Sequence, residues 1–187
     1  MLQLHPHEQL TPSTWVCRFA HLIAPGGAVL DLACGRGRHA RYLAGLGYQV
    51  EAVDRDSAAL ASLAGIPGIS TRCADLEASP WPYAAGGFDG IVVANYLHRP
   101  LTAALLYALR PGGIFIYETF ARGNEKLGKP SNPEFLLHPG ELLQWVDGRL
   151  QVLAFEQGLV MQAKPAVVQR LCAVHRAVAG CRLELFA

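Results

Sequence analysis

The chain has 187 residues, and 51% of them are hydrophobic, which excludes a disordered protein and favours one folded unit that buries roughly 70% of its unfolded surface. A formal net charge of +1 gives no electrostatic reason to expect nucleic acid or an anionic membrane as the partner. No apolar run reaches the ~18 residues of a membrane span, and the first twelve residues lack the basic and apolar regions of a secretory signal. Five cysteines without a C-x-x-C pair favour reduced thiols, so we expect a cytoplasmic protein.

The first third of the chain predicts helices that alternate with short apolar strands. Thr11 is predicted to cap a first helix that carries Trp15 and Phe19 on its apolar face. A second helix is expected from Arg38 to Ala44, and Asp56 is expected to cap a third at residues 57–63. This alternation is typical of a parallel sheet.

The rest of the chain continues the alternation and ends in a hairpin. Helices are predicted at residues 100–109 and 141–146, and a polar segment rich in Gly and Pro, residues 119–139, separates the last strands from the core. Residues 182–186 form a final strand or a tail. The predicted strands are residues 28–32, 48–53, 69–73, 90–94, 114–118, 150–160 and 167–177.

The turn after the first strand, Ala33 to Gly37, is the most informative motif. Gly35 and Gly37 let a ligand approach the backbone closely, and the helix that follows offers free N–H groups. Asp54 ends the second strand, 23 positions after Asp31, where a β-α-β unit places a carboxylate beside a ribose.

Asp31 distinguishes between two kinds of nucleotide ligand. An acid four positions before Gly35 would repel the pyrophosphate of a dinucleotide, whereas the ammonium group of S-adenosylmethionine would be attracted to it. A nicotinamide-dependent oxidoreductase is still an alternative, because Gly35-x-Gly37-x-x-Ala40 and Asp54 also fit that fingerprint.

The D-x-x-x-G-x-G pattern with its second acid resembles the class I S-adenosylmethionine-dependent methyltransferases, and residues 29–113 resemble the tellurite-resistance (TehB-like) group. The resemblance implies a three-layer, Rossmann-like α/β fold with a seven-stranded, mostly parallel sheet and an antiparallel C-terminal hairpin strand. It divides the single domain 1–187 into an N-terminal helical cap (1–25), a cofactor-binding core (26–118), a substrate loop (119–140) and a C-terminal helix and hairpin (141–187).

The resemblance also assigns residues to the cofactor. Asp31 would orient the ammonium, the turn would contact the methionine part, Asp54 would accept hydrogen bonds from the ribose, and S-adenosylhomocysteine would be the product. The implied cofactor-binding residues are Asp31, Ala33, Gly35, Gly37, Asp54, Arg55, Asp75, Leu76 and Asn95.

Methyl transfer to a hydroxyl or an amine needs a group that removes a proton, whereas a thiolate or a reduced chalcogenide needs none. His98, Glu118 and Tyr96 are the candidates, although His98 could instead bond a backbone carbonyl and Glu118 could pair with Arg99 or Arg122.

Three further polar residues have two possible roles each. Arg99, Arg122 and Asn124 could hold an anionic substrate or anchor their loop. His39 and Cys34 are expected to be structural, and the scattered histidines predict no metal site.

The acceptor is expected to be a small molecule. The fourth strand is followed by Asn95-Tyr96-Leu97-His98 rather than the Asn/Asp-Pro-Pro-aromatic motif used on exocyclic base amines, and no basic stripe is present. A cofactor-binding domain without turnover is a further alternative.

Overall fold

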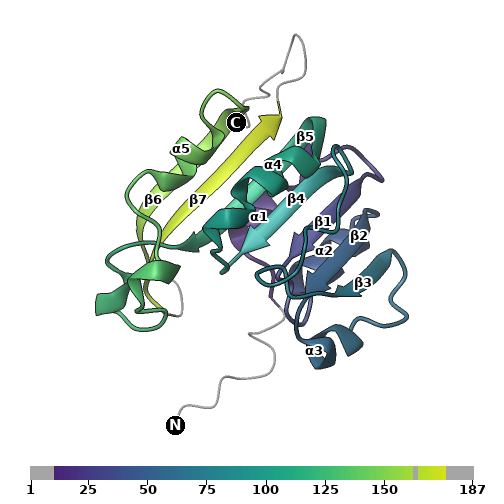
Figure 1. The fold of residues 1–187 in the computed structure, drawn as a ribbon, viewed down its shortest axis with the longest axis horizontal. Coiled ribbons are helices and arrows are strands. Elements are labelled where there is room, and N and C mark those ends of the chain that lie inside the picture. The colour runs from purple at the N-terminus through teal and green to yellow at the C-terminus, as the bar shows by residue number, and fades with distance from the viewer. Residues whose placement is uncertain (1–10, 162–163, 176–187) are drawn as a thin grey trace.

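A computed structural model describes residues 11–161 and 164–175, and its centre is one seven-stranded sheet with the order β3-β2-β1-β4-β5-β7-β6 (Figure 1). Neighbours from β3 to β5 pair in parallel, whereas β7 is antiparallel to both β5 and β6. This confirms the predicted fold class. The strands are β1 (Ala28–Leu32), β2 (Gln49–Asp54), β3 (Ile69–Cys73), β4 (Phe88–Ala94), β5 (Leu109–Phe120), β6 (Leu150–Val160) and β7 (Ala166–His175).

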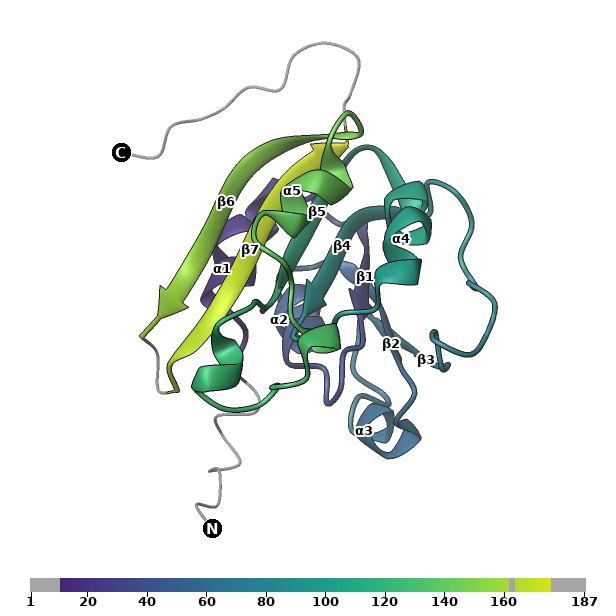
Figure 2. The ribbon, with the colours of Figure 1, turned by 60° about the vertical axis from the view of Figure 1, so that its left-hand side comes forward.

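Helices cover both faces of the sheet and give the molecule three layers (Figures 1 and 2). One apolar core joins the sheet to α4 and α5, and a second joins the other face to α1, α2 and α3. The helices are α1 (Thr14–Phe19), α2 (Arg38–Gly45), α3 (Ser57–Ala61), α4 (Thr102–Ala108) and α5 (Glu141–Val146).

The central strands β1 and β4 are apolar because both of their faces are buried. Leu30 and Ile91 belong to the core under α4, and their neighbours Val29 and Val92 belong to the core over α2. Because β1 to β5 run parallel, their carboxyl ends lie along one edge of the sheet, which is where a doubly wound sheet binds ligands.

Several predicted boundaries were wrong. Ser13, not Thr11, caps α1 by accepting a hydrogen bond from the Trp15 N–H. Strand β5 begins at Leu109 rather than Ile114, because Leu109 pairs with Phe88 on β4. A 3-10 helix, Arg99–Leu101, precedes a shortened α4. The segment predicted at 182–186 lies outside the described residues.

The polar segment after β5 has defined structure. It contains two short 3-10 helices, Asn124–Lys126 and Pro133–Phe135, and an isolated bridge between Ala121 and Leu137. Leu136 and Leu137 are buried, so this segment is attached to the core at its C-terminal end.

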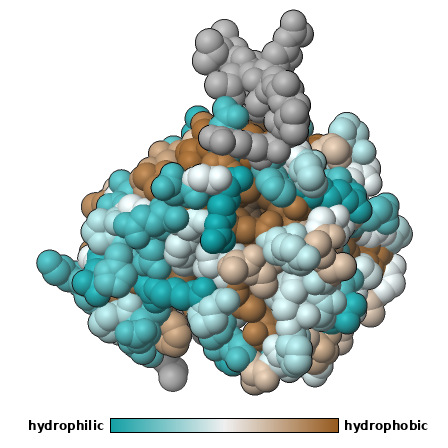
Figure 3. Space-filling view, turned by 45° about the horizontal axis from the view of Figure 1, so that its top comes forward, coloured by the Kyte–Doolittle hydropathy of each residue, from teal (hydrophilic) through white to brown (hydrophobic). Residues whose placement is uncertain are grey.

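Polar and apolar residues are mixed on the surface. Figure 3 shows a face on which hydrophilic and hydrophobic residues are interspersed, with brown areas broken by teal and white ones. Among the described residues, no helix has the length and apolar character needed to cross a bilayer.

Candidate active site

The turn between β1 and α2 has an unusual backbone. Gly35 and Gly37 have φ angles of 54° and 71°, and Ala33 has 52°, a left-handed conformation that a residue with a Cβ rarely adopts. A Cβ on Gly37 would lie 2.5 Å from the Leu63 methyl carbons, whereas one on Gly35 would have no neighbour within 4 Å. Gly37 is therefore required by packing, and Gly35 leaves open space at the end of β1.

Asp54 joins this turn to the end of β2. One carboxylate oxygen accepts the Gly35 N–H at 2.7 Å, and the other accepts the Asp56 N–H at 2.9 Å. Each oxygen keeps a further lone pair, so the carboxylate can accept additional hydrogen bonds.

Asp31 lies beneath the turn and is only 1% exposed. Its carboxyl accepts the Ala40 N–H at 2.9 Å, and burial raises its pKa to about 7. Burial also lowers the pKa of His39 to about 3, so the 3.9 Å approach of the two side chains is not an ion pair near neutral pH. His39 accepts the Ser13 N–H, which agrees with its expected structural role.

A cavity of about 140 Å³ opens beside the turn at the ends of β1, β2 and β3. Five of the nine predicted cofactor residues line it: Ala33, Asp54, Arg55, Asp75 and Leu76. Four further residues complete the wall: Val53, Ala74, Glu77 and Tyr96. We call this space the first cavity.

A second cavity of about 360 Å³ adjoins the first and shares Arg55, Glu77 and Tyr96 with it. Its remaining lining residues come from the ends of β4 and β5 and from the segment after β5: Asn95, Leu97, Thr119, Phe120, Pro130 and Phe135. Asn95 thus lies in the second cavity, whereas Asp31, Gly35 and Gly37 line neither.

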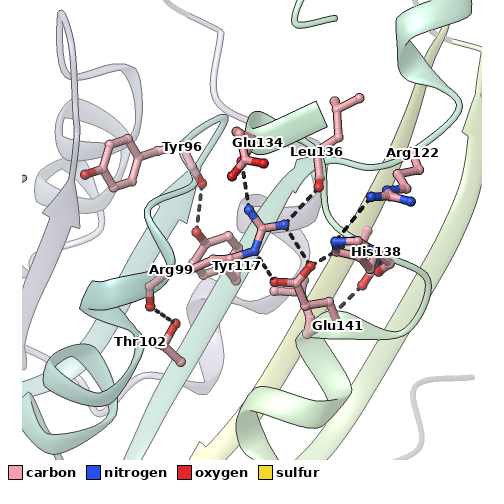
Figure 4. Close-up of polar contacts among 11 residues, drawn as sticks. Tyr96, Arg99, Thr102, Tyr117, Arg122, Glu134, Leu136, His138 and Glu141 are labelled. Atoms are coloured by element: carbon pink, nitrogen blue, oxygen red, sulfur yellow. Dashed lines mark hydrogen bonds and ion pairs between the residues drawn. The ribbon is translucent and has the colours of Figure 1, made fainter. Parts of the chain in front are cut away.

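Tyr96 forms part of the wall between the cavities, and a partly buried hydrogen bond fixes its backbone. Its carbonyl accepts the Tyr117 hydroxyl at 2.7 Å (Figure 4). The preceding Asn95 has a left-handed φ of 58°. Burial and the neighbouring Glu77 carboxylate raise the pKa of Tyr96, so its phenol stays protonated.

The predicted proton acceptors occupy different places. His98 Nδ1 lies 3.8 Å from a Glu77 carboxylate oxygen, close to both cavities. Glu118 lines neither cavity, and its expected pairing with Arg99 or Arg122 is wrong. Glu118 lies opposite Arg170 on β7, and its Oε2 is 2.8 Å from Arg170 Nε. The two side chains form an ion pair, but their angles do not meet those of a hydrogen bond.

Arg99 anchors the segment after β5 (Figure 4). Its guanidinium bonds both carboxylate oxygens of Glu141, at 2.7 and 3.0 Å, and donates to the carbonyls of Glu134 and Leu136. Burial opposes ionisation of Glu141, but Arg99 and the His138 N–H lower its pKa overall. Of the two readings of Arg99, the structure supports loop anchoring.

The other two residues considered for an anionic substrate also have structural partners. The Asn124 amide donates to the Pro130 carbonyl and accepts the Val167 N–H, and an Arg122 nitrogen lies 3.4 Å from a His138 ring nitrogen.

Several residues that line the two cavities were not predicted from the sequence. Glu77 follows Asp75 by two positions and could have been included from the strand-end rule, since it also lies after β3. Phe120, Pro130 and Phe135 lie in the segment expected as the substrate loop (119–140), but the sequence did not single them out, because only the path of the segment brings them to the second cavity.

The described residues hold no group of three or more His, Cys, Asp or Glu side chains suited to a metal ion. Burial raises the pKa of Cys34 in the turn, which keeps it a thiol and agrees with the expected packing role.

Residues 29–113 match a protein family described as methyltransferase domain. No curated protein matches the chain. Among solved structures, TehB from Haemophilus influenzae superposes with a TM-score of 0.73 at 22% identity, covering 86% of this chain. This chain spans 61% of TehB. The fold similarity agrees with the predicted resemblance to the TehB-like group.

Two further structures match over nearly all of this chain. An S-adenosylmethionine-dependent methyltransferase from Mesorhizobium loti has a TM-score of 0.67 at 16% identity, with coverage of 87% of this chain and 99% of that one. The 1,6-didemethyltoxoflavin-N1-methyltransferase of Burkholderia thailandensis, with bound 1,6-didemethyltoxoflavin and S-adenosylhomocysteine, has a TM-score of 0.65 at 19% identity, with coverage of 92% and 80%.

Proposed function

We propose that this chain is a class I S-adenosylmethionine-dependent methyltransferase and that it transfers a methyl group to a small molecule bound in the second cavity, a proposal supported by the match of residues 29–113 to a methyltransferase domain. S-adenosylmethionine supplies an electrophilic methyl group on a sulfonium when it is bound. The match to a methyltransferase domain supports this function over the nicotinamide alternative.

One observation carries the proposal. The first cavity has the residues expected for an adenosine group, and a larger cavity shares its wall. A methyl donor and a small acceptor could therefore meet at Tyr96 and Asn95. Bringing the two reactants into alignment can supply about 7–11 kcal/mol of barrier reduction.

The residues at the first cavity fit the cofactor. Asp54 would accept the ribose hydroxyls with its remaining lone pairs, and Leu76 and Asp75 would hold the adenine face and edge, with Arg55 at the side. The open space above Gly35 would take the methionine part, next to Ala33 and Gly37. Asp31 would orient the ammonium through a water or the turn backbone.

Proton removal would depend on the acceptor. Of the three residues predicted for this role, the surroundings favour the His98–Glu77 pair at the cavities over Tyr96, whose phenol stays protonated, and over Glu118, which Arg170 already engages. We also propose a cytoplasmic location, because the described cysteines Cys17, Cys34, Cys73 and Cys172 are all free thiols.

Calorimetry with S-adenosylhomocysteine tests the donor site. The Asp54→Ala variant should bind it at least tenfold more weakly, since each hydrogen bond to a charged acceptor contributes roughly 1.5–3 kcal/mol. Asp147→Ala is the matched control, because Asp147 is an exposed acid at the far end of α5 and should leave binding unchanged. Absence of binding by the unaltered protein would refute the proposal.

The alternative of a cofactor-binding domain without turnover predicts the same binding. Incubation with isotopically labelled S-adenosylmethionine and a broad panel of small acceptors separates the two, because only an enzyme forms a labelled product.

A further inference from the structure

The second cavity has walls suited to a flat apolar molecule. Three aromatic side chains line it, Tyr96, Phe120 and Phe135, and Leu97 and Pro130 add further apolar surface. Aromatic side chains contribute about 0.5–1.5 kcal/mol per ring pair beyond the burial of their area, through offset or edge-to-face contacts. The walls therefore favour a ring over a compact ion.

Phe135 is the most informative of these rings, because it is 53% exposed although it is large and apolar. Arg99 donates to the carbonyl before it, of Glu134, and to the carbonyl after it, of Leu136, at 2.8 and 3.0 Å. Glu141 holds the same guanidinium from the other side. The Phe135 backbone is thus held in place while its ring stays open to a ligand.

The charged groups of the second cavity do not favour an oxyanion. Among the described residues that line it, Arg55 is the one cation, and the carboxylate of Glu77 accompanies it. The cations expected to hold an anionic substrate, Arg99 and Arg122, contact Glu141 and His138 instead. A carboxylate at the cavity wall would attract a hydrogen-bond donor and repel an anion.

We propose, building on the proposed function, that the acceptor is a planar aromatic molecule of one or two rings carrying a hydroxyl or ring N–H, bound among Tyr96, Phe120 and Phe135, and that Glu77 takes its proton. The acceptor oxygen or nitrogen forms a bond to the methyl carbon, the electron pair of the carbon–sulfur bond returns to sulfur, and the proton passes to a Glu77 carboxylate oxygen. His98, 3.8 Å from Glu77, is a positioning residue for that carboxylate.

A pair of probes tests the ring requirement without knowledge of the natural acceptor. Protein saturated with S-adenosylhomocysteine is titrated with 2-naphthol, which is flat, and with decahydro-2-naphthol, the saturated molecule of the same skeleton. We expect 2-naphthol to bind at least fivefold more tightly, and Phe135→Ala to remove most of that preference. Tyr107→Ala is the control, because Tyr107 is exposed on α4 and lines neither cavity.

The fluorescence of 2-naphthol tests Glu77, because excited naphthol transfers its proton to a nearby base and the naphtholate emits at longer wavelength. Bound probe should give more naphtholate emission in the unaltered protein than in Glu77→Gln. Equal emission would overturn the role of Glu77. The proposed acceptor class would be overturned by any of three results: equal binding of the two naphthols, no binding of 2-naphthol, or displacement of bound 2-naphthol by selenite. Failure of S-adenosylhomocysteine to bind in the first step would instead refute the proposed function.

Discussion

Asp31 is the residue in which the demands of folding and of ligand binding conflict most clearly. Its carboxyl is buried under the glycine turn with one backbone hydrogen bond, from Ala40, and burial raises its pKa from 3.8 to about 7. A carboxyl with a raised folded pKa stabilises the fold when it is protonated. Its contribution is full below about pH 3.8 and is lost as the pH rises through 7.

We therefore expect Asp31→Asn to be more stable than the unaltered protein at pH 8, by on the order of 1–4 kcal/mol, with a smaller advantage at pH 5.5. Urea unfolding at a series of pH values measures this. The pKa of His39 is lowered, so the stability that His39 contributes declines as the pH falls from 6.5 towards 3. Both proteins contain His39, so this contribution cancels in the difference between them. A difference that does not change with pH would contradict the assignment.

Gly35 allows a test of the turn as a ligand site. Gly35→Ala places a Cβ at a φ of 54°, which costs about 1–2 kcal/mol, and fills the open space at the end of β1. We expect the affinity for S-adenosylhomocysteine to fall at least tenfold in calorimetry. Gly26→Ala is the control, because Gly26 has a φ of 69°, also has no neighbour within 4 Å, and lies before β1. If both variants bind normally, the turn does not contact the ligand.

At the scale of elements, the segment between β5 and α5 depends on one arginine. Arg99 links the start of the α4 region to the 3-10 helix at Pro133–Phe135 and to the first turn of α5 (Figure 4). A lysine at this position would keep the charge but not the forked set of donors, so it could not bond Glu141 and both carbonyls together.

We expect Arg99→Lys to lower the free energy of unfolding by about 1–3 kcal/mol and to speed amide hydrogen exchange in residues 133–137. Arg110→Lys is the matched control, since Arg110 also joins a carboxylate, Asp89, and a carbonyl, Gly86, but at the opposite end of the strands. Exchange in residues 133–137 should be unchanged in the control, and a similar increase there in both variants would contradict the role of Arg99.

At the scale of the whole molecule, the two cavities collect residues from the ends of all five parallel strands, from Ala33 after β1 to Phe120 on β5. A ligand in the first cavity would contact β1, β2 and β3 together, so its binding free energy should stabilise the fold as one unit.

S-adenosylhomocysteine at 100 times its Kd should contribute about 2.7 kcal/mol and raise the Tm by about 5–10 °C in a chain of this length. NADH at the same concentration should shift the Tm by less than about 1 °C, since the acid Asp31 beneath the turn would repel its pyrophosphate. Differential scanning calorimetry measures both, and a larger shift with NADH would reverse our assignment of the ligand.

The sequence by itself determined what depends on short stretches of chain. The bounds of β1, β3, α5 and β6 were predicted as observed, because apolar runs and their turn residues are local signals. The turn around Gly35 and the acid at the end of β2, Asp54, were also predicted from local signals, since both belong to one β-α-β unit.

Only the tertiary structure decided which side chains meet across long separations. Glu118 pairs with Arg170 because β7 inserts beside β5, and Arg99 bonds Glu141 across 42 positions because the intervening segment turns back. Phe135 and Glu77 reach the second cavity by the same folding of distant segments. Five residues of the first cavity were therefore readable from local patterns, whereas the second cavity depends on where the chain after β5 packs.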